Sequence, residues 1–534
     1  MERALEGVSA SPGVAIGPAT ILDRGGTAGA VVPPRRRREE ISRARSALDA
    51  VAGELDAIAS RLRREGRGGE ADIVDTGVLM AGDPGFVERV EALVMSGLAA
   101  PEALRGAARE TANALAALDD PTLALRADDV RSLGRRAAAR AAGLNGTARE
   151  GILVADTLGP ADVAELAGTA TGIALAGGGV TSHAAIVARS LGLPMVIGLG
   201  GAVLDTQDGE EVVIDGDGGL FVRGPSVGRA ASARDAVERT RAAREVAIAH
   251  RAEPAVTQDG RRIRVLANAS TVAELEEALE QGAEGVGLMR TELLFLEARH
   301  WPAFELQVQV MRPVLARLAG QVATVRLFDF GADKTPPFLQ GVKKRGIEIL
   351  LDAPDVLQTH TRAVIEAGQG TQLRVLVPMV GTAAQMRAVR QFVDAGVQVG
   401  AMIETPEAAA CAIEIARVSD FLSIGTNDLT QLVLGLDREQ SRRAPVMDAR
   451  VLRLIAQTMR AARQASIPVD VCGEAASDPA ALPVMVGFGA DELSVAAARV
   501  GQTRERVRSL NYTVCETEAA QLLDEVGHAS RERV

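Results

Sequence analysis

The chain has 534 residues, of which 47% are hydrophobic and 24% are charged, a globular composition that excludes a disordered or fibrous protein. Only 2% of the residues are aromatic and the formal net charge is −11. Nucleic-acid binding needs aromatic stacking surfaces or a positive field, so we expect no nucleic-acid partner. Any anionic substrate would have to be held by a local cluster of arginines.

Cysteine content and hydropathy indicate the compartment. The three cysteines are too few to stabilise a chain of this size by disulfide bonds, which favours a reducing environment. They are Cys411, Cys472 and Cys515. The N-terminal residues MERALEGVSASPGVAIG lack the pattern of a secretory signal, and no window approaches 18 uninterrupted apolar residues. We therefore expect a cytoplasmic, multidomain protein without membrane insertion.

The first part of the chain changes its periodicity. Residues 7–22 have the pattern of short apolar strands, whereas apolar residues from Ile41 to Leu62 recur at spacings of three and four, which is typical of an amphipathic helix. Three more helical stretches are expected up to about Arg140, interrupted at Gly82-Asp83-Pro84, Pro101 and Asp120-Pro121. Helices with short connections indicate an antiparallel bundle.

Strand–helix alternation returns at Gly151, with the runs GILVAD, TGIALAGGG, PMVIGLG and EVVIDGDGG. The simplest arrangement is one α/β domain, formed by 1–27 and 146–227, into which the helical bundle of 28–145 is inserted. The segment 228–252 is charged and alanine-rich, with no Pro or Gly after Gly228, and predicts a linker helix.

The remaining residues, 253–534, contain eight apolar runs, most of them separated by helix-length segments. The runs are 263–268, 285–290, 322–330, 373–380, 397–404, 420–428, 467–474 and 490–495. Their even spacing favours a (β/α)₈ TIM barrel over an open doubly wound sheet. The predicted fold is thus a multidomain α/β protein that ends in a barrel.

Polar residues stand at the C-terminal ends of these runs, where the catalytic groups of such a barrel lie. They are Asn268, Arg290, Arg326, Glu404, Asn427, Asp428 and Cys472. A single arginine there is most simply one half of a surface ion pair, but Arg290 and Arg326 each follow an apolar strand. Lys334 and Arg438 lie in loops just beyond. Such a cluster suits a phosphate together with a carboxylate, because guanidinium groups bind both in bidentate geometry.

Glu404 and Asp428 supply the hard oxygen ligands that Mg²⁺ prefers, leaving other positions to water and substrate. The barrel mouth therefore predicts a site for a small phosphorylated carboxylic acid with a divalent metal. Cys472 is either a small buried hydrophobe or a proton donor, since nearby negative charge disfavours its thiolate. Spacing alone does not decide between these two roles.

A second candidate site lies in residues 174–198, ALAGGGVTSHAAIVARSLGLPMVIG. A strand runs into three glycines, Thr181 or Ser182 can cap the helix that follows, and His183 lies in its first turn. The positive end of the helix dipole suits an anion and favours a neutral, nucleophilic imidazole at His183. Metal binding is weakly supported, because no second His or Cys stands at ligand spacing.

At this point the motifs resemble a known family. GGGVTSHAAIVARSLGLPMVIG resembles the phosphohistidine motif of the phosphoenolpyruvate-utilising enzymes, and GVGLMRTELLF, VRLFDFGADK, MIETP, SIGTNDLTQ and VCGEAASD resemble its barrel motifs. GVSASPGVAIG and DDPTLALRADDVRSLGRR are similar to the enzyme I branch of this family, the phosphoenolpyruvate-protein phosphotransferases of bacterial sugar uptake. That resemblance implies a swivelling phosphohistidine domain, an inserted carrier-binding bundle and a phosphoenolpyruvate-binding barrel.

The resemblance also implies roles for single residues. His183 matches the histidine that is phosphorylated on Nε2, Thr181 the threonine beside it, and Cys472 the residue that protonates the enolate of pyruvate. Glu404 and Asp428 match the Mg²⁺ ligands. The matches to substrate-binding residues are Arg290, Arg326, Lys334, Arg345, Asn427, Asp428 and Arg438. The implied partners are an HPr-like phosphocarrier protein and a second copy of the chain, bound through the barrel.

Three departures from the family pattern stand out. The segment QGVKKRGIEILL is short and lacks an Asn-Pro stretch before Arg345, the segment EQSRRAPVMD after Arg438 is short and lacks a Tyr, and Leu327 and Ala332 replace Thr and Gly. These departures motivate one alternative function, a catalytically weak paralogue that acts as a regulatory interaction protein.

Overall fold

The computed structural model describes most of the chain in two compact units, Met1–Ala242 and Ala243–Val534. The described residues are 2–22, 31–64, 68–117, 121–144, 150–166, 168–179, 182–296, 298–331, 334–436 and 446–531. Within these ranges, no helix is long and apolar enough to cross a membrane.

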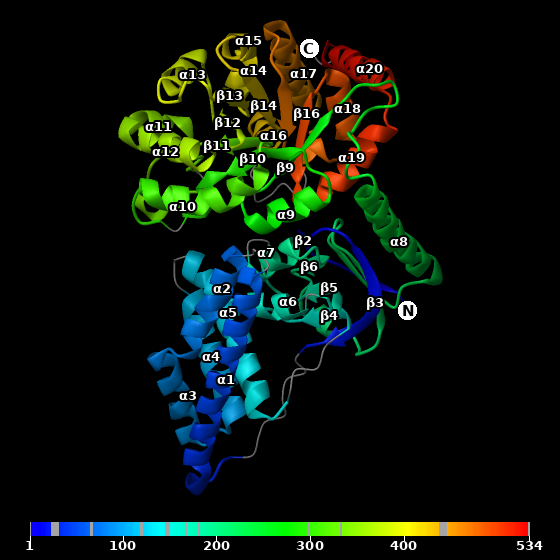
Figure 1. The fold of residues 1–534 in the computed structure, drawn as a ribbon. Helices are drawn as coiled ribbons and strands as arrows, with labels where there is room; N and C mark the ends of the chain where they lie inside the picture. Colours follow the sequence, from blue (N-terminus) through cyan, green and yellow to red (C-terminus); the bar gives the residue numbers. More distant parts are fainter. Residues whose placement is uncertain are drawn as a thin grey trace. The chain divides into compact units, whose positions relative to one another are not determined.

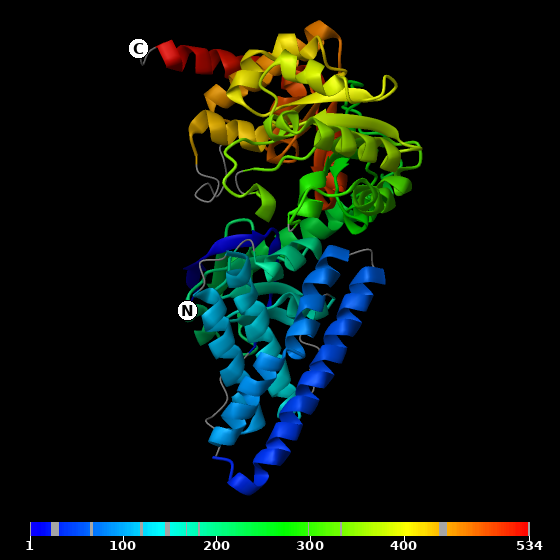
Figure 2. The ribbon, with the colours of Figure 1, turned by 90° about the vertical axis from the view of Figure 1, so that its left-hand side faces the viewer.

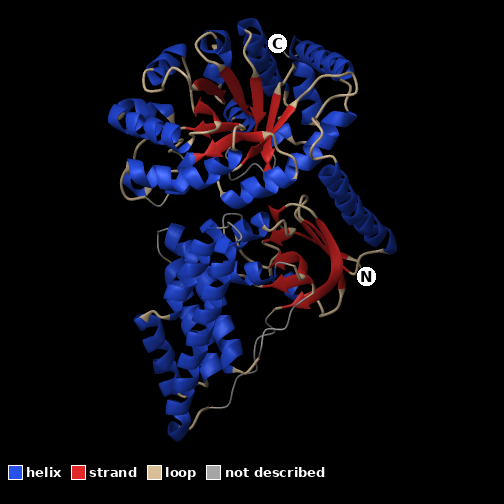
Figure 3. Ribbon diagram, in the orientation of Figure 1, coloured by secondary structure: helices blue, strands red, loops and turns tan. Residues whose placement is uncertain are grey.

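An eight-stranded sheet forms the centre of the first unit, in the order β1-β8-β7-β3-β4-β5-β6-β2 (Figures 1 and 3). Its strands are β1 (Arg3–Glu6), β2 (Val8–Ser11), β3 (Val14–Ile21), β4 (Gly151–Ala155), β5 (Ala170–Leu175), β6 (Met195–Ile197), β7 (Glu211–Asp215) and β8 (Leu220–Arg223). Strand β3 pairs in parallel with β4, for example Ala19 with Ile152. The chain therefore leaves the sheet after β3 and returns to the same place, which confirms the predicted insertion.

The insertion is a bundle of five helices that run alongside one another (Figure 2). They are α1 (Arg37–Arg64), α2 (Gly68–Ala81), α3 (Pro84–Ser96), α4 (Ala100–Ala116) and α5 (Pro121–Ala141). The apolar stripe of α1 is buried, as its periodicity predicts. In the described residues four helices follow α1, whereas three were predicted, because the glycines at 66, 68 and 69 were not counted as a break between two helices.

Asp162 connects this bundle to the α/β domain through hydrogen bonds and ion pairs. It lies buried on α6 (Pro160–Leu166) and accepts hydrogen bonds from Ser132 Oγ at 2.6 Å and Arg136 Nε at 2.7 Å. Arg135 is a third partner on the same helix, α5. Burial alone would raise the pKa of Asp162, but the two arginines outweigh it and hold the pKa far below its ordinary value.

The second unit is a closed parallel barrel in the order β10-β11-β12-β13-β14-β15-β16-β9 (Figures 1 and 3). Its strands are β9 (Arg264–Asn268), β10 (Gly285–Arg290), β11 (Val322–Arg326), β12 (Gln372–Val377), β13 (Gln398–Ile403), β14 (Phe421–Gly425), β15 (Val469–Cys472) and β16 (Glu492–Ala496). Strand β9 pairs with both β10 and β16 and so closes the ring. The predicted barrel is confirmed.

Helices alternate with these strands and cover the outside of the barrel (Figure 3). They are α9 (Val272–Glu280), α10 (Phe304–Leu315), α11 (Ile347–Asp352), α12 (Pro354–Ala367), α13 (Ala383–Arg390), α14 (Pro406–Ala410), α15 (Ala412–Ala416), α16 (Thr426–Leu434), α17 (Ala449–Ala465), α18 (Ala481–Phe488), α19 (Val500–Ser509) and α20 (Tyr512–Arg531). A helix, α8 (Val227–Ala249), occupies the segment in which a linker helix was predicted. The exact domain boundaries stay a prediction.

Replacing Asp162 by Asn is expected to destabilise the first unit by about 3–5 kcal/mol at neutral pH, because Arg135 and Arg136 lose their buried counter-charge. A carboxylate with a lowered folded pKa stabilises the protein above its unfolded pKa of about 3.9 and less as the pH falls below it. The difference from the native protein should therefore shrink below about pH 4.

Hydrogen exchange in α5 and α6, measured by mass spectrometry at neutral pH and again below about pH 4, tests this expectation. Glu165→Gln is the matched control, since Glu165 also pairs with Arg136 but its side chain is 58% exposed. Equal protection of α5 and α6 in Asp162→Asn and in the control would contradict the connecting role of Asp162.

Candidate active site

A cavity of about 340 Å³, including the space open to solvent, lies at the C-terminal ends of the barrel strands. It gathers residues from five strands and their loops. They are Leu288, Arg290, Arg326, Lys334, Met402, Glu404, Gly425, Asn427, Asp428, Cys472 and Gly473. Seven of the residues predicted from strand ends and loops thus lie around one cavity, as the shared edge of a parallel barrel requires.

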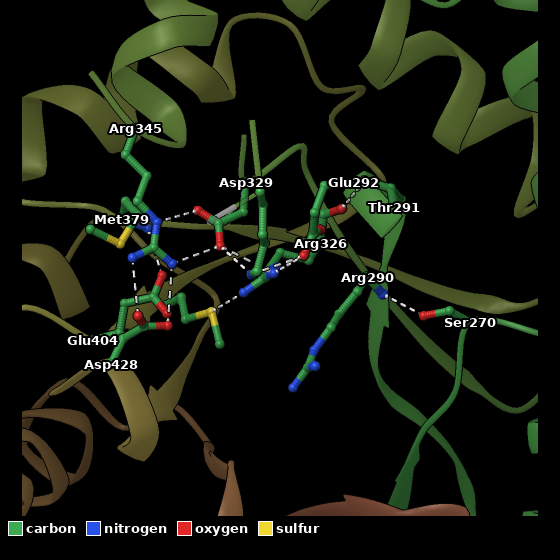
Figure 4. Close-up of polar contacts among 12 residues, drawn as sticks. Ser270, Arg290, Thr291, Glu292, Arg326, Asp329, Arg345, Met379, Glu404 and Asp428 are labelled. Carbon is green, nitrogen blue, oxygen red and sulfur yellow. Dashed lines mark hydrogen bonds and ion pairs between the residues drawn. The ribbon is translucent and has the colours of Figure 1, made fainter. Parts of the chain in front are cut away.

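Arg326 is the centre of a buried ion-pair network on one side of this cavity (Figure 4). Its side chain is 3% exposed; it pairs with Glu292 and lies 3.2 Å from Asp329 Oδ2. Lys334 Nζ lies 3.2 Å from Glu292 Oε1 and 3.0 Å from Asp329 Oδ2. Burial would lower the pKa of Arg326, but Glu292 and Asp329 outweigh it and raise the pKa above its ordinary value.

Arg345 connects this network to Asp428. Its Nε lies 3.2 Å from Asp329 Oδ1, and its Nη1 lies 3.0 Å from Asp428 Oδ1 (Figure 4). Burial would raise the pKa of Asp329, yet Arg326, Lys334 and Arg345 lower it to about 2. Asp329 is therefore an anion at neutral pH, and it fixes three cations around itself.

Arg290 behaves differently from Arg326. Its backbone N–H donates to Ser270 Oγ at 3.0 Å, and its side chain lines the cavity. Figure 4 shows the guanidinium extending away from the network of Arg326. Among the described residues it makes no hydrogen bond or ion pair, so its five N–H donors remain for an anion.

Glu404 and Asp428 lie next to each other at the cavity, where they can receive a hard cation (Figure 4). Glu404 is fully buried, and its Oε1 accepts the backbone N–H of Met379 at 2.8 Å. Within the described chain its Oε2 has no hydrogen-bond partner. Burial and the charges of Asp329 and Asp428 outweigh Arg326 and raise the pKa of Glu404 to about 7.

The free Oε2 of Glu404 beside the carboxylate of Asp428 fits Mg²⁺, which binds through one or two carboxylates and completes its shell with water and substrate oxygens. No group of three His, Cys, Asp or Glu side chains in the described residues could hold a metal by itself. Any cation at these two carboxylates therefore needs oxygens from a substrate or from water.

Cys472 has features that fit both of the roles that its sequence position left open. It is 1% exposed and packs with Leu288, Leu376 and Met402, yet it also lines the cavity. Burial, with Asp470 nearby, raises its pKa to about 12. Cys472 is therefore a protonated thiol within reach of a bound molecule, which favours a proton donor. Asn427 also lines the cavity, and its Oδ1 accepts the backbone N–H of Glu474 at 2.9 Å.

In the first unit, His183 begins helix α7 (His183–Ser190). Ser182 is the N-cap residue, since its Oγ accepts the backbone N–H of Ala185 at 3.3 Å. His183 Nδ1 lies 2.9 Å from Asp129 Oδ2 of helix α5, and the imidazole is 13% exposed. A carboxylate at Nδ1 accepts its proton and leaves the lone pair on Nε2.

Several partners of these residues were not predicted from the sequence. Asp129 stands 54 residues from His183, and Asp329 and Glu292 stand next to the arginine motifs. The acidic pair in RADDV and the acids in MRTELL and RLFDF were visible signals, but the fold of each unit decides which side chains they meet. Arg438, Thr181, Ala332 and most of the segment after Arg438 lie outside the described residues.

Three family descriptions cover most of the chain. They are "PEP-utilising enzyme, N-terminal" at residues 6–126, "PEP-utilising enzyme, mobile domain" at 147–219 and "PEP-utilising enzyme, PEP-binding domain" at 244–512. The last of these alone covers half of the sequence.

Curated relatives agree with these matches. A multiphosphoryl transfer protein of Rhodobacter capsulatus is 37% identical over 80% of this chain and 54% of its own length, and one of Xanthomonas campestris is 36% identical over 98% and 65%. The chain thus spans between half and two thirds of these two proteins. A phosphoenolpyruvate-protein phosphotransferase of Streptomyces coelicolor is 36% identical over 97% of this chain and 96% of its own. The chain belongs to the family of phosphoenolpyruvate-utilising enzymes.

Proposed function

We propose that this chain transfers the phosphoryl group of phosphoenolpyruvate to Nε2 of His183, releases pyruvate, and passes the phosphoryl group to a histidine of an HPr-like phosphocarrier protein. One observation carries the proposal most directly. A single cavity presents the unengaged guanidinium of Arg290, the unpaired oxygen of Glu404 and the protonated thiol of Cys472. These are the groups needed to bind a phosphorylated carboxylate and to protonate its enolate.

Substrate binding follows from the charges at the cavity. Arg290 supplies bidentate donors to the phosphate or carboxylate, and Arg326 and Lys334 face the same space while held by Glu292 and Asp329. Arg345 holds the carboxylate of Asp428, and Asn427 holds the backbone at Glu474 beside the cavity. Bound between Glu404, Asp428 and the substrate, Mg²⁺ would neutralise the charge of the transferring phosphoryl group. Glu404 would have to be ionised to hold such a cation, and burial with the nearby Asp329 and Asp428 raises its pKa to about 7.

The transfer also requires a nucleophile with the correct tautomer. Asp129 accepts the Nδ1 proton of His183, so Nε2 presents its lone pair to phosphorus. When the P–O bond of the substrate breaks, the enolate of pyruvate is left in the cavity. Cys472 then gives its proton to the terminal carbon, which yields pyruvate.

The partners and the assembly extend this proposal. The Streptomyces relative is named a phosphoenolpyruvate-protein phosphotransferase, which supports a protein as the acceptor. We propose that the helical bundle receives the carrier and that two chains associate through the barrel. A catalytically weak regulatory paralogue is the alternative, but the presence of Arg290, Glu404 and Cys472 around one cavity speaks against it.

Incubation with Mg²⁺ and phosphoenolpyruvate labelled in its phosphate is expected to place an acid-labile, base-stable phosphoryl group on His183. Digestion followed by mass spectrometry locates the label. His183→Ala should take up none, and label in that variant would contradict His183 as the acceptor. Release of label from the native protein on addition of a carrier protein would separate an enzyme from a regulatory paralogue.

Replacing Asp129 by Asn is expected to slow labelling of His183 by at least about 10-fold, because the amide no longer holds the Nδ1-protonated tautomer by charge. Rapid-quench measurement of label formation provides the rate. Asp128→Asn is the matched control on the same helix, since Asp128 pairs with Arg131 at 2.8 Å and not with His183. Equal rates in the two variants would contradict a role for Asp129 in the tautomer.

Arg290→Ala is expected to weaken binding of phosphoenolpyruvate. It should leave the melting temperature nearly unchanged, because the Arg290 guanidinium makes no hydrogen bond or ion pair within the described structure. The loss of one charged contact corresponds to about 2–5 kcal/mol of binding free energy. Arg326→Ala should instead lower the melting temperature, because Glu292 and Asp329 lose a buried counter-charge. Calorimetric titration measures the affinity for phosphoenolpyruvate, and thermal unfolding measures the melting temperature. A native affinity in Arg290→Ala would show that Arg290 does not bind the substrate.

A further inference from the structure

A second polar cluster lies deeper in the barrel, beneath the thiol of Cys472. Asp470 on β15 is 4% exposed, and its two carboxylate oxygens accept different hydroxyl groups. Ser423 on β14 donates to Oδ2 at 2.7 Å, and Ser494 on β16 donates to Oδ1 at 2.9 Å. Both serines are fully buried. Gly287 on β10 makes room for Ser494, since a Cβ there would stand 1.7 Å from its Oγ.

Ser423 links this cluster to the active site. Its Oγ lies 3.4 Å from Cys472 Sγ as well as 2.7 Å from Asp470, while Sγ also lies 3.5 Å from the carbonyl oxygen of Ile424. A hydroxyl has one proton, so Ser423 can donate to Asp470 or to Sγ, but not to both. Donation to Sγ leaves the Ser423 oxygen to accept a proton from Asp470. The three side chains therefore have two hydrogen-bond arrangements, which differ by the transfer of a proton along the chain.

The surroundings of Asp470 place its pKa much closer to neutral pH than the pKa of Cys472. Burial and the carboxylate of Glu492 on β16 outweigh the two serines and Arg374 on β12, and raise the pKa of Asp470 to about 7. Glu492 itself is paired with Arg374 at 2.7 Å and with Arg264 on β9. Cys472, with its pKa raised to about 12, is a poor acid by itself. Asp470 is thus a far better source of a proton at neutral pH than the thiol.

We propose that Asp470 stores the proton that Cys472 delivers, and that Ser423 carries it between them. This inference rests on the proposed function. The thiol proton goes to the carbon of the enolate, the Ser423 hydroxyl proton goes to Sγ, and the Asp470 proton goes to the Ser423 oxygen. Three bonds to hydrogen break and three form, and the negative charge ends on Asp470, where Ser423 and Ser494 donate to it. After pyruvate leaves, a proton from solvent at the cavity returns to Asp470 along the same path, through Sγ and Ser423. Asp470 is a positioning residue here, since it acts on the substrate only through Cys472.

A single-turnover experiment separates this relay from a merely structural role. Native enzyme, Asp470→Asn and Ser494→Ala are mixed with Mg²⁺ and labelled phosphoenolpyruvate, and the label on His183 and the pyruvate formed are followed together. In Asp470→Asn, which keeps the shape of the side chain, label should form within about threefold of the native rate. Pyruvate should form about 10- to 100-fold more slowly, a smaller loss than removal of the acid group that touches the substrate would give. Ser494→Ala removes one donor to Asp470 but leaves the path through Ser423 intact, so it should leave labelling unchanged and slow pyruvate formation less than Asp470→Asn does.

The path through Ser423 has its own signature. Ser423→Ala should slow pyruvate formation about as much as Asp470→Asn, and the double variant should be no slower than the slower single variant, because both changes break one relay. Mixed H₂O and D₂O should give a curved dependence of the native pyruvate rate on deuterium fraction, and a linear one in Ser423→Ala.

The outcomes are distinguishable. Pyruvate formation that keeps pace with labelling in Asp470→Asn, or equal slowing of both rates, would overturn the relay and leave the proposed function standing. Failure of the native protein to label His183 would overturn the proposed function itself.

Discussion

The buried anion of Asp329 is the constraint on which the barrel mouth depends. Three cations, Arg326, Lys334 and Arg345, converge on its two oxygens, and Glu292 holds two of them from the other side. Removing any one member leaves a charge without compensation in a site that excludes most water, which costs several kcal/mol. The mouth is therefore preorganised before any ligand arrives, since its cations are already fixed by protein carboxylates.

This arrangement divides the arginines into two classes. Arg326 and Arg345 are largely committed to protein carboxylates, so they shape the cavity and supply a fixed field. Arg290 is uncommitted among the described residues and supplies the contact that a substrate can gain in full. Such a buried network is weak evidence for stability, because apolar residues of the same volume usually stabilise a core at least as well. Its presence at strand ends is better explained by the binding of a charged substrate.

The sequence predicted the parts of this site that depend on position along a strand. Eight apolar runs located the strand ends, so Arg290, Arg326, Glu404 and Cys472 could be named before their surroundings were known. Partners across the barrel could not be named, because Arg345 meets Asp428 over a separation of 83 residues and register decides the contact. The same holds for Asp129, which reaches His183 from an inserted bundle. The roles of these residues stay predictions that the geometry supports.

The interior of the barrel follows a different rule from its outer wall. Outward-facing side chains of the strands form one apolar core with the helices, which needs only size and periodicity. Inward-facing positions instead hold Asp470, Ser423 and Ser494, whose hydrogen bonds are mutually satisfied. Buried polar groups are tolerated when each has a hydrogen-bond partner. The thiol of Cys472 stands at the boundary between this polar interior and the cavity, so its chemistry depends on both.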